Sequence, residues 1–186
     1  MINLIKNYFS RMKGGKPSPS RKPFSKIAWS WLGAFIGIYC VSELNHFLHI
    51  DLLNSVFLVG SFGASAVLIY GAPQAEFSQP RNLIGGHLIS AFIGITIYKF
   101  VPLDSTILGA LAVSLAIVAM HFTCTLHPPG GATALIAVIG SDNIHDLGYL
   151  FVLSPIGAGA LIMLIVALFT NNLSSNPERH YPRYWF

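Results

Sequence analysis

Five long stretches of this chain contain no Asp, Glu, Lys or Arg, and they limit its fold more than any other feature. They are Ile27–Ser42, Leu52–Ala75, Asn82–Tyr98, Ser105–Ser141 and Leu147–Pro177. A helix that crosses the hydrocarbon core of a bilayer needs about 20 apolar residues, within a range of about 17–25. Charged residues make up 10% of the chain, whereas soluble domains carry about 25%. The sequence therefore predicts an all-α, polytopic membrane helix bundle with no room for a separate catalytic domain.

A basic arm precedes the first apolar stretch. Residues 1–26 contain seven Lys or Arg and no acidic residue, and basic residues beside a span mark its cytoplasmic side. We expect a cytoplasmic arm over residues 1–26, a transmembrane domain over residues 27–172 and a cytoplasmic tail over residues 173–186. The protein is then a multi-pass protein of the inner, or plasma, membrane with both termini in the cytoplasm. A transit peptide or a nucleic-acid tail is the alternative for the arm, and no nucleic-acid partner is expected.

A helix-breaking string interrupts the fourth uncharged stretch. Residues 126–134 read Leu-His-Pro-Pro-Gly-Gly-Ala-Thr-Ala. Proline lacks an N–H and glycine is conformationally loose, so this string cannot continue a helix. Irregular backbone persists in lipid only where protein buries it or where it lines a cavity. A broken element in the middle of a hydrophobic run is where a transport protein would bind its substrate.

A similar block occurs in the first half of the chain. Gly63–Leu68 resembles Gly131–Ile136, and Gly60–Gly63 interrupts the apolar stretch around it. We therefore expect two repeats of helix, broken or half helix, and helix, although chance or generic membrane composition could also produce so short a match. About five extended residues and about ten helical residues reach about 30 Å, so each broken element could cross the membrane. Six crossings with the two halves inverted are preferred over four crossings with two re-entrant loops.

The broken elements end where short helices begin, and this predicts anion binding. A helix N-terminus has about four N–H groups without internal partners and carries about half a positive charge. Glycines let an anion approach these groups, and two such ends facing one cavity would bind a small monovalent anion near the membrane midplane. The predicted substrate-binding residues are His127, Pro128, Pro129, Gly130, Gly131, Ala132 and Thr133 in the second half, and Gly63, Ala64 and Ser65 in the first. The alternative is that the small residues merely allow close helix packing.

Three further side chains are titratable or charged candidates. His127 could gate the site, relay a proton or donate to an anion, or it could hydrogen-bond a carbonyl left open by the prolines. His87 lies about one turn inside an apolar helix, where ionisable residues are functional candidates. Arg81 could concentrate anions at the mouth of the pathway or anchor the cytoplasmic side. No catalytic residue, cofactor or metal site is predicted.

Two sequence blocks are similar to those of one family. His127-Pro128-Pro129 followed by Gly130–Ala134 resembles the signature of the HPP family of integral membrane proteins, and Gly63–Ala66, Gln79–Asn82 and Gly85–His87 resemble its first block. The resemblance covers about residues 27–170. It implies a small membrane protein, usually described with four helices, and family members have been linked to nitrite transport.

The function expected from the residues and the resemblance together is transport of a small monovalent anion, nitrite above all. The site would lie at the half-helix N-termini. The alternatives are a structural or assembly subunit of a membrane complex and a small membrane enzyme that uses His127 as a base. The expected partners are the anion and the lipid bilayer, and a homo-oligomer stays open.

Overall fold

The computed structural model describes residues 2–13 and 17–186, and within them the regular elements are all helical. Long apolar runs form the long helices because a helix satisfies its own backbone hydrogen bonds. The elements are α1 (Ile2–Ser10), α2 (Phe24–Phe47), α3 (Leu52–Ala66), η1 (Val67–Gly71), η2 (Glu76–Ser78), α4 (Pro80–Phe100), α5 (Ser105–Phe122), α6 (Pro129–Ile139), α7 (Asp142–Leu147), η3 (Val152–Gly157), α8 (Ala158–Asn172) and η4 (Pro177–Arg179). Five helices are long and apolar enough to cross a membrane. The predicted all-α membrane bundle is confirmed.

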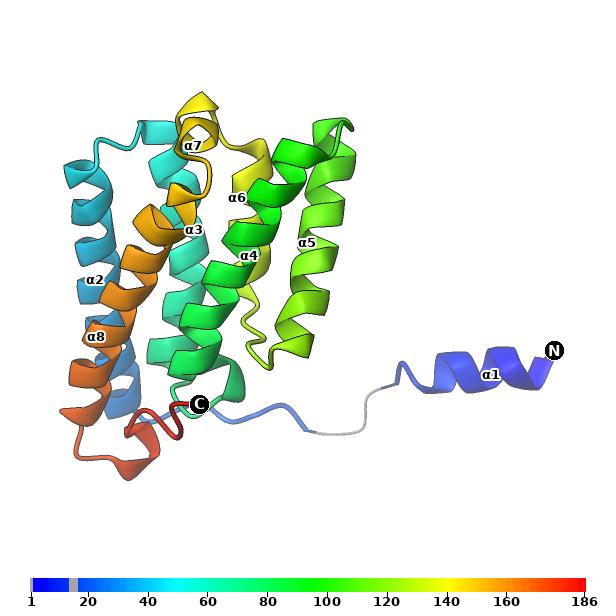
Figure 1. The fold of residues 1–186 in the computed structure, drawn as a ribbon. Helices are drawn as coiled ribbons and strands as arrows, with labels where there is room; N and C mark the ends of the chain where they lie inside the picture. Colours follow the sequence, from blue (N-terminus) through cyan, green and yellow to red (C-terminus); the bar gives the residue numbers. More distant parts are fainter. Residues whose placement is uncertain (1, 14–16) are drawn as a thin grey trace.

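The passes of the chain alternate in direction along the bundle (Figure 1). Helices α2 and α4 run one way, and α3, α5 and α8 run the other way. The shorter α6 follows the non-helical residues 123–128, and the two together run between the ends of the bundle. The start of α2, the η2 loop and the C-terminal segment lie at one end, and α7 lies at the other. Helix α6 has 11 residues and is shorter than the helices that can span a membrane, so the six crossings stay a prediction.

The break predicted at Gly60–Gly63 is wrong. Helix α3 runs without interruption from Leu52 to Ala66, and η1 continues it to Gly71. A glycine inside a helix costs only about 1 kcal/mol relative to alanine, and no proline here removes a backbone donor. Gly63, Ala64 and Ser65 therefore lie in the middle of a helix and not at an N-terminus. The two halves do not share a matched broken element.

Helix α4 packs closely against the second-half break through its glycines. A Cβ atom built on Gly86 would lie 2.5 Å from Cβ of His127. One built on Gly94 would lie 2.5 Å from the carbonyl oxygen of Ala134 in α6. Neither position has room for a methyl group, since carbon atoms in contact normally stay farther apart. Glycine at these positions lets α4 lie directly against the broken element.

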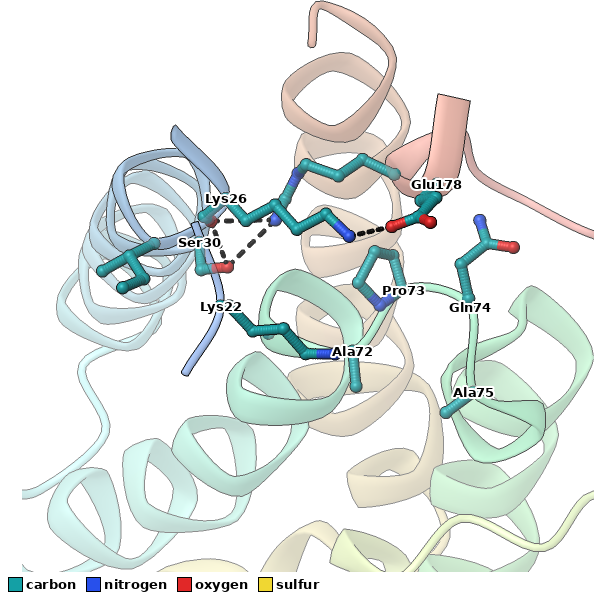
Figure 2. A pocket seen from close by; sticks show the side chains of 11 residues that line it. Lys22, Lys26, Ser30, Ala72, Pro73, Gln74, Ala75 and Glu178 are labelled. Carbon is teal, nitrogen blue, oxygen red and sulfur yellow. Dashed lines mark hydrogen bonds and ion pairs between the residues drawn. The ribbon is translucent and has the colours of Figure 1, made fainter. Parts of the chain in front are cut away.

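The C-terminal segment packs onto the end of the bundle. Tyr181 is 2% exposed and donates a hydrogen bond to the carbonyl of Ser78 at 2.8 Å. Burial raises the pKa of the Tyr181 phenol. Arg179 donates to the carbonyl of Tyr70 at 2.9 Å. Beside it, a pocket of about 620 Å³ opens where Lys26 of α2 forms an ion pair with Glu178 (Figure 2). The tail predicted at residues 173–186 thus closes one end of the bundle.

Candidate functional site

The irregular segment between α5 and α6 has partners for several of its backbone groups. After α5, the N–H of Thr125 donates to the carbonyl of Met120 at 2.9 Å. Arg81 Nη2 donates to the carbonyl of Thr123 at 2.7 Å, and Asn82 Nδ2 donates to the carbonyl of Leu126 at 2.9 Å. Neighbouring side chains in the first turn of α4 therefore satisfy carbonyls that a helix would otherwise satisfy. This explains how irregular backbone persists inside an apolar bundle.

The N-terminus of α6 uses its own donors. The helix begins at Pro129, which like Pro128 has no N–H. The N–H of Gly130 donates to the carbonyl of His127 at 2.8 Å, and that of Gly131 donates to the carbonyl of Pro128 at 3.0 Å. In this conformation, the glycine N–H groups assigned to an anion by the sequence are therefore bonded to backbone carbonyls. An anion would reach them only if this turn opened.

Five polar side chains converge in the interior of the bundle, and each is at most 2% exposed. They are Ser61 and Ser65 of α3, His87 of α4, His127 of the break and Thr133 of α6. We call this set the polar cluster. Buried polar groups inside a membrane protein are costly unless they are hydrogen-bonded, and they commonly mark a functional site.

His127 forms one end of the polar cluster. Its Nδ1 lies 2.7 Å from the carbonyl oxygen of Phe77, in the loop before α4. Its Nε2 lies 2.9 Å from Oγ of Ser65, and the same Oγ lies 2.8 Å from Nε2 of His87. One serine hydroxyl therefore bridges the two imidazoles, whose ring centroids are 5.0 Å apart. A carbonyl only accepts, so Nδ1 of His127 carries a hydrogen.

His87 continues the cluster toward α6. Its Nδ1 lies 2.8 Å from Oγ1 of Thr133. That oxygen lies 2.9 Å from Oγ of Ser61, which in turn lies 3.1 Å from the carbonyl oxygen of Pro129 and can donate to it. The five side chains thus form a continuous series of contacts between two carbonyl groups. We call this series the hydrogen-bond chain.

The helix geometry explains why these side chains meet. Ser61 and Ser65 are four residues apart, so they lie on one face of α3 and point the same way. Gly86 precedes His87 and lets the break approach α4. Ser61 and the carbonyl of Phe77 were not among the residues predicted from the sequence. The spacing of Ser61 from Ser65 is a signal that could have identified Ser61, whereas nothing in the sequence marks one carbonyl among many.

The structure brings some of the predicted residues together and leaves others apart. Ser65, His87, His127 and Thr133 meet in the polar cluster, and Pro129 contributes its carbonyl. Gly130 packs beside them, since a Cβ built there would lie 2.7 Å from Oγ of Ser90. Six predicted residues lie outside the cluster. No atom lies within 4 Å of a Cβ built on Gly63, and a Cβ built on Gly131 would lie 3.6 Å from Val113. Ala64, Pro128 and Ala132 are exposed, and Arg81 donates to the carbonyl of Thr123.

The polar cluster can hold protons and donate hydrogen bonds, and its own side chains include no acid. Each neutral imidazole both donates and accepts, and each hydroxyl does the same. No salt bridge involves a member of the cluster among the described residues. The arrangement therefore suits a small anion, a proton or both more than a metal cation.

Comparison with known proteins bears on the family. The profile described as "HPP, transmembrane region" matches residues 19–182. A transmembrane protein of Dictyostelium discoideum is 44% identical over 182 residues, which cover 96% of this chain and 57% of that protein. A second transmembrane protein of that organism is 43% identical over 187 residues, which cover 98% of this chain and 64% of its own length. The chain thus spans less than two thirds of either relative.

No solved structure matches the chain. The family match extends over nearly all of the helical bundle and includes both sequence blocks that suggested it. The predicted family is confirmed, and this multi-pass membrane protein belongs to the HPP family.

Proposed function

We propose that the protein transports a small monovalent anion, preferentially nitrite, and that the anion binds at the polar cluster. One observation carries this proposal: a proline-broken element brings two histidines and three hydroxyl groups together inside an apolar bundle. Such groups are expensive to bury in a membrane, and broken helices near the midplane are typical of transport sites. A purely structural subunit would gain nothing from this arrangement.

The donors of the cluster fit an anion that must be released again. Hydroxyl and imidazole groups donate hydrogen bonds without a permanent positive charge, so binding stays weak enough for passage. Opening the turn at Gly130 and Gly131 would add two backbone N–H groups beside the positive end of the α6 dipole. The cluster contains neither a carboxylate nor a thiol, and we therefore propose transport rather than catalysis. Nitrite is the preferred anion because the family resemblance links it to these motifs.

We place the protein in the plasma membrane with both termini in the cytoplasm. The charges at the two ends of the bundle support this orientation. The start of α2, the η2 loop with the start of α4, and the C-terminal segment lie at one end and include Lys22, Lys26, Arg81, Arg179 and Arg183 together with Glu76 and Glu178. The α2–α3 connection, the end of α4, the start of α5 and α7 lie at the other end and include Asp51, Asp104, Asp142 and Asp146 together with Lys99. Basic residues are enriched on the cytoplasmic side of membrane proteins, so the first end is the cytoplasmic one in this proposal.

Uptake into proteoliposomes tests the proposal. Vesicles that contain only this protein should take up nitrite faster than empty vesicles, and faster than they take up nitrate, formate or chloride. Ser65→Ala removes the hydroxyl between the two imidazoles and should lower nitrite uptake about tenfold, because a buried hydrogen bond is lost. Ser114→Ala is the matched control, since Ser114 is exposed on α5, and it should leave uptake unchanged.

Two results would count against this proposal. Absence of flux for every anion would remove the transport function. Equal nitrite uptake by wild type and Ser65→Ala would mean that the anion passes elsewhere.

A further inference from the structure

The hydrogen-bond chain has one contact more than it has hydrogens when both histidines are neutral. Six contacts of 3.1 Å or less join the carbonyl of Phe77 to the carbonyl of Pro129 through five side chains. Ser65 Oγ also lies 3.4 Å from the carbonyl oxygen of Ser61, and Thr133 Oγ1 lies 3.5 Å from that of Pro129; these two longer contacts are weaker alternatives to the six. A neutral imidazole has one N–H and a hydroxyl has one O–H, so the five side chains supply five hydrogens. Both ends are carbonyls, which supply none. One contact must therefore lack a hydrogen.

The missing hydrogen falls at the Pro129 end in the neutral chain. The contact from Ser61 to Pro129 is the longest of the six, at 3.1 Å, and the Pro129 carbonyl also accepts the regular helical bond of α6. When no hydrogen lies between Ser61 and Pro129, each side chain donates its hydrogen to the neighbouring group that is nearer to the Phe77 carbonyl. Ser61 then donates to Thr133, and Thr133 donates to Nδ1 of His87. His87 carries its hydrogen on Nε2.

One added proton fills all six contacts. The charge can reside on His127 or on His87, because Ser65 can donate to either imidazole. In both arrangements His87 carries a hydrogen on Nδ1 and donates it to Thr133, which donates to Ser61. Ser61 then donates to the carbonyl of Pro129. Protonation therefore reverses this part of the chain, whichever ring holds the charge.

We propose that the hydrogen-bond chain is a binding site for one proton and that this proton crosses the membrane together with the anion. The second part rests on the proposed function. A buried imidazolium without a counter-charge is unfavourable, and so is a buried anion without a positive partner. Each ligand therefore strengthens binding of the other, as linkage requires. Transport is then electroneutral, with one proton for each monovalent anion.

Among the described residues, the groups around the hydrogen-bond chain provide no other counter-charge, and His121 of the neighbouring α5 is exposed. Helices α3 and α6 contain no titratable side chain, and neither do η3 and α8. On α4, Arg81 donates to the carbonyl of Thr123, and Lys99 lies 5.3 Å from the ring centroid of Tyr149. Beside Phe77, Glu76 is exposed. His87 and His127 are thus the titratable groups that face each other in the cluster, and the anion itself supplies the missing negative charge.

Imidazole ¹⁵N spectra of the full chain in lipid nanodiscs test the proton site directly. The signals of the cluster are assigned by replacing the other five histidines, which are His46, His49, His121, His145 and His180. Acidification in the presence of nitrite should convert Nδ1 of His87 from a nitrogen without hydrogen to one that carries hydrogen. Nδ1 of His127 should carry hydrogen throughout. A Nδ1 of His87 that already carries hydrogen at high pH, or never gains it, overturns the proton site.

A valine variant separates the hydrogen-bond chain from simple histidine protonation. Thr133→Val removes the acceptor for Nδ1 of His87. Protonation of this nitrogen should then need a proton concentration about tenfold higher, because a hydrogen bond to a charged group is lost. Thr96→Val is the matched control, since Thr96 is half-buried on the same helix as His87 and its hydroxyl donates to the carbonyl of Phe92, outside the polar cluster; it should titrate like the wild type. Equal titration of Thr133→Val and wild type overturns the chain.

Flux measurements test coupling separately. Nitrite uptake should be driven by an inward proton gradient, should alkalinise the outer medium by one proton per nitrite, and should not respond to a potassium diffusion potential. Free nitrous acid crossing the lipid is subtracted with empty vesicles. Flux that follows the potential and ignores the pH gradient overturns the coupling and leaves the proposed function in place. His87 conversion without any anion flux overturns the proposed function and leaves the proton site in place.

Discussion

Replacing Gly86 by alanine tests whether the distances in the polar cluster matter for transport. The added Cβ would lie 2.5 Å from Cβ of His127 and 2.9 Å from the carbonyl oxygen of Thr125. Ordinary van der Waals contact begins at 3.4 Å. The break must therefore move away from α4 by about 0.9 Å, which is the difference between 3.4 Å and 2.5 Å. Neither neighbour is the far end of a flexible side chain, so the backbone takes up this shift.

A shift of this size is large relative to the hydrogen bonds of the cluster. The contact from His127 to Ser65 is 2.9 Å, and the part of the shift that lies along this contact lengthens or compresses it relative to the narrow range in which N and O form a good hydrogen bond. Loss of one buried hydrogen bond costs about 1–3 kcal/mol, so substrate affinity should fall about tenfold. Overpacking costs about 1–3 kcal/mol of folding stability, and the better helix propensity of alanine offsets about 1 kcal/mol of this.

The assay combines nitrite uptake with unfolding in detergent. Gly86→Ala should raise the nitrite concentration for half-maximal uptake about tenfold and lower the stability of the protein by about 0–2 kcal/mol. Gly60→Ala is the control, because no atom lies within 4 Å of a Cβ at that exposed position on α3. It should keep wild-type uptake and should gain up to about 1 kcal/mol of stability. A folded Gly86→Ala protein with wild-type uptake would refute the idea that the distances in the cluster determine transport.

Three further substitutions test the ends of the bundle and the break. Asp51→Ala removes the N-cap of α3 and should lower the free energy of unfolding by about 1 kcal/mol. Hydrogen bonds from Asn54 and Asn143 lower the pKa of Asp51, so the stabilisation by Asp51 is complete above about pH 3.9 and disappears as the pH falls through the folded-state pKa. Unfolding in detergent at several pH values measures this dependence. Arg179→Ala should lower the free energy of unfolding by at least about 2 kcal/mol, because the buried partners of Arg179 lose their donors. Arg183 is exposed, so Arg183→Ala should lower the free energy of unfolding by less. Equal losses in the two variants would contradict this reasoning. Asn82→Ala leaves a carbonyl in the break without its donor and should cost about 1–3 kcal/mol while lowering nitrite uptake; unchanged unfolding and uptake would show that this bond does not hold the break.

The sequence predicted the long helices well because apolar length alone decides them in a membrane. Charge-free stretches located α2, α4 and α5, and two adjacent prolines located the break before α6, although the helix begins at Pro129, inside the string predicted to be broken. The predicted break at Gly60–Gly63 was wrong because glycine only weakens a helix, whereas proline removes a donor and creates a clash. Residue similarity to the second half could not distinguish these two effects.

The candidate site was predicted in part. His87 and His127 were identified as ionisable residues in apolar segments, and Ser65 and Thr133 as members of the two similar blocks. The structure shows that all four share one hydrogen-bond chain. Their mutual distances depend on how α3, α4 and α6 pack, which periodicity does not reveal. The engagement of the Gly130 N–H also depends on local backbone geometry, so the sequence could not show that this donor is occupied.

The glycine contacts between α4 and α6 have a mechanical consequence. Backbone and carbonyl atoms meet there without side chains between them, and Asn82 ties the start of α4 to the break. These elements should therefore move as one rigid body. Helix α3 meets this body partly through the hydroxyl groups of Ser61 and Ser65, which water or an anion can replace at little cost. The rest of the contact is apolar, as at Leu58, which shares a buried cluster with Ala91 and Ile136. A gate at the polar cluster would thus open by a movement of α3 relative to the α4–α6 body, in which the hydrogen bonds of Ser61 and Ser65 break first.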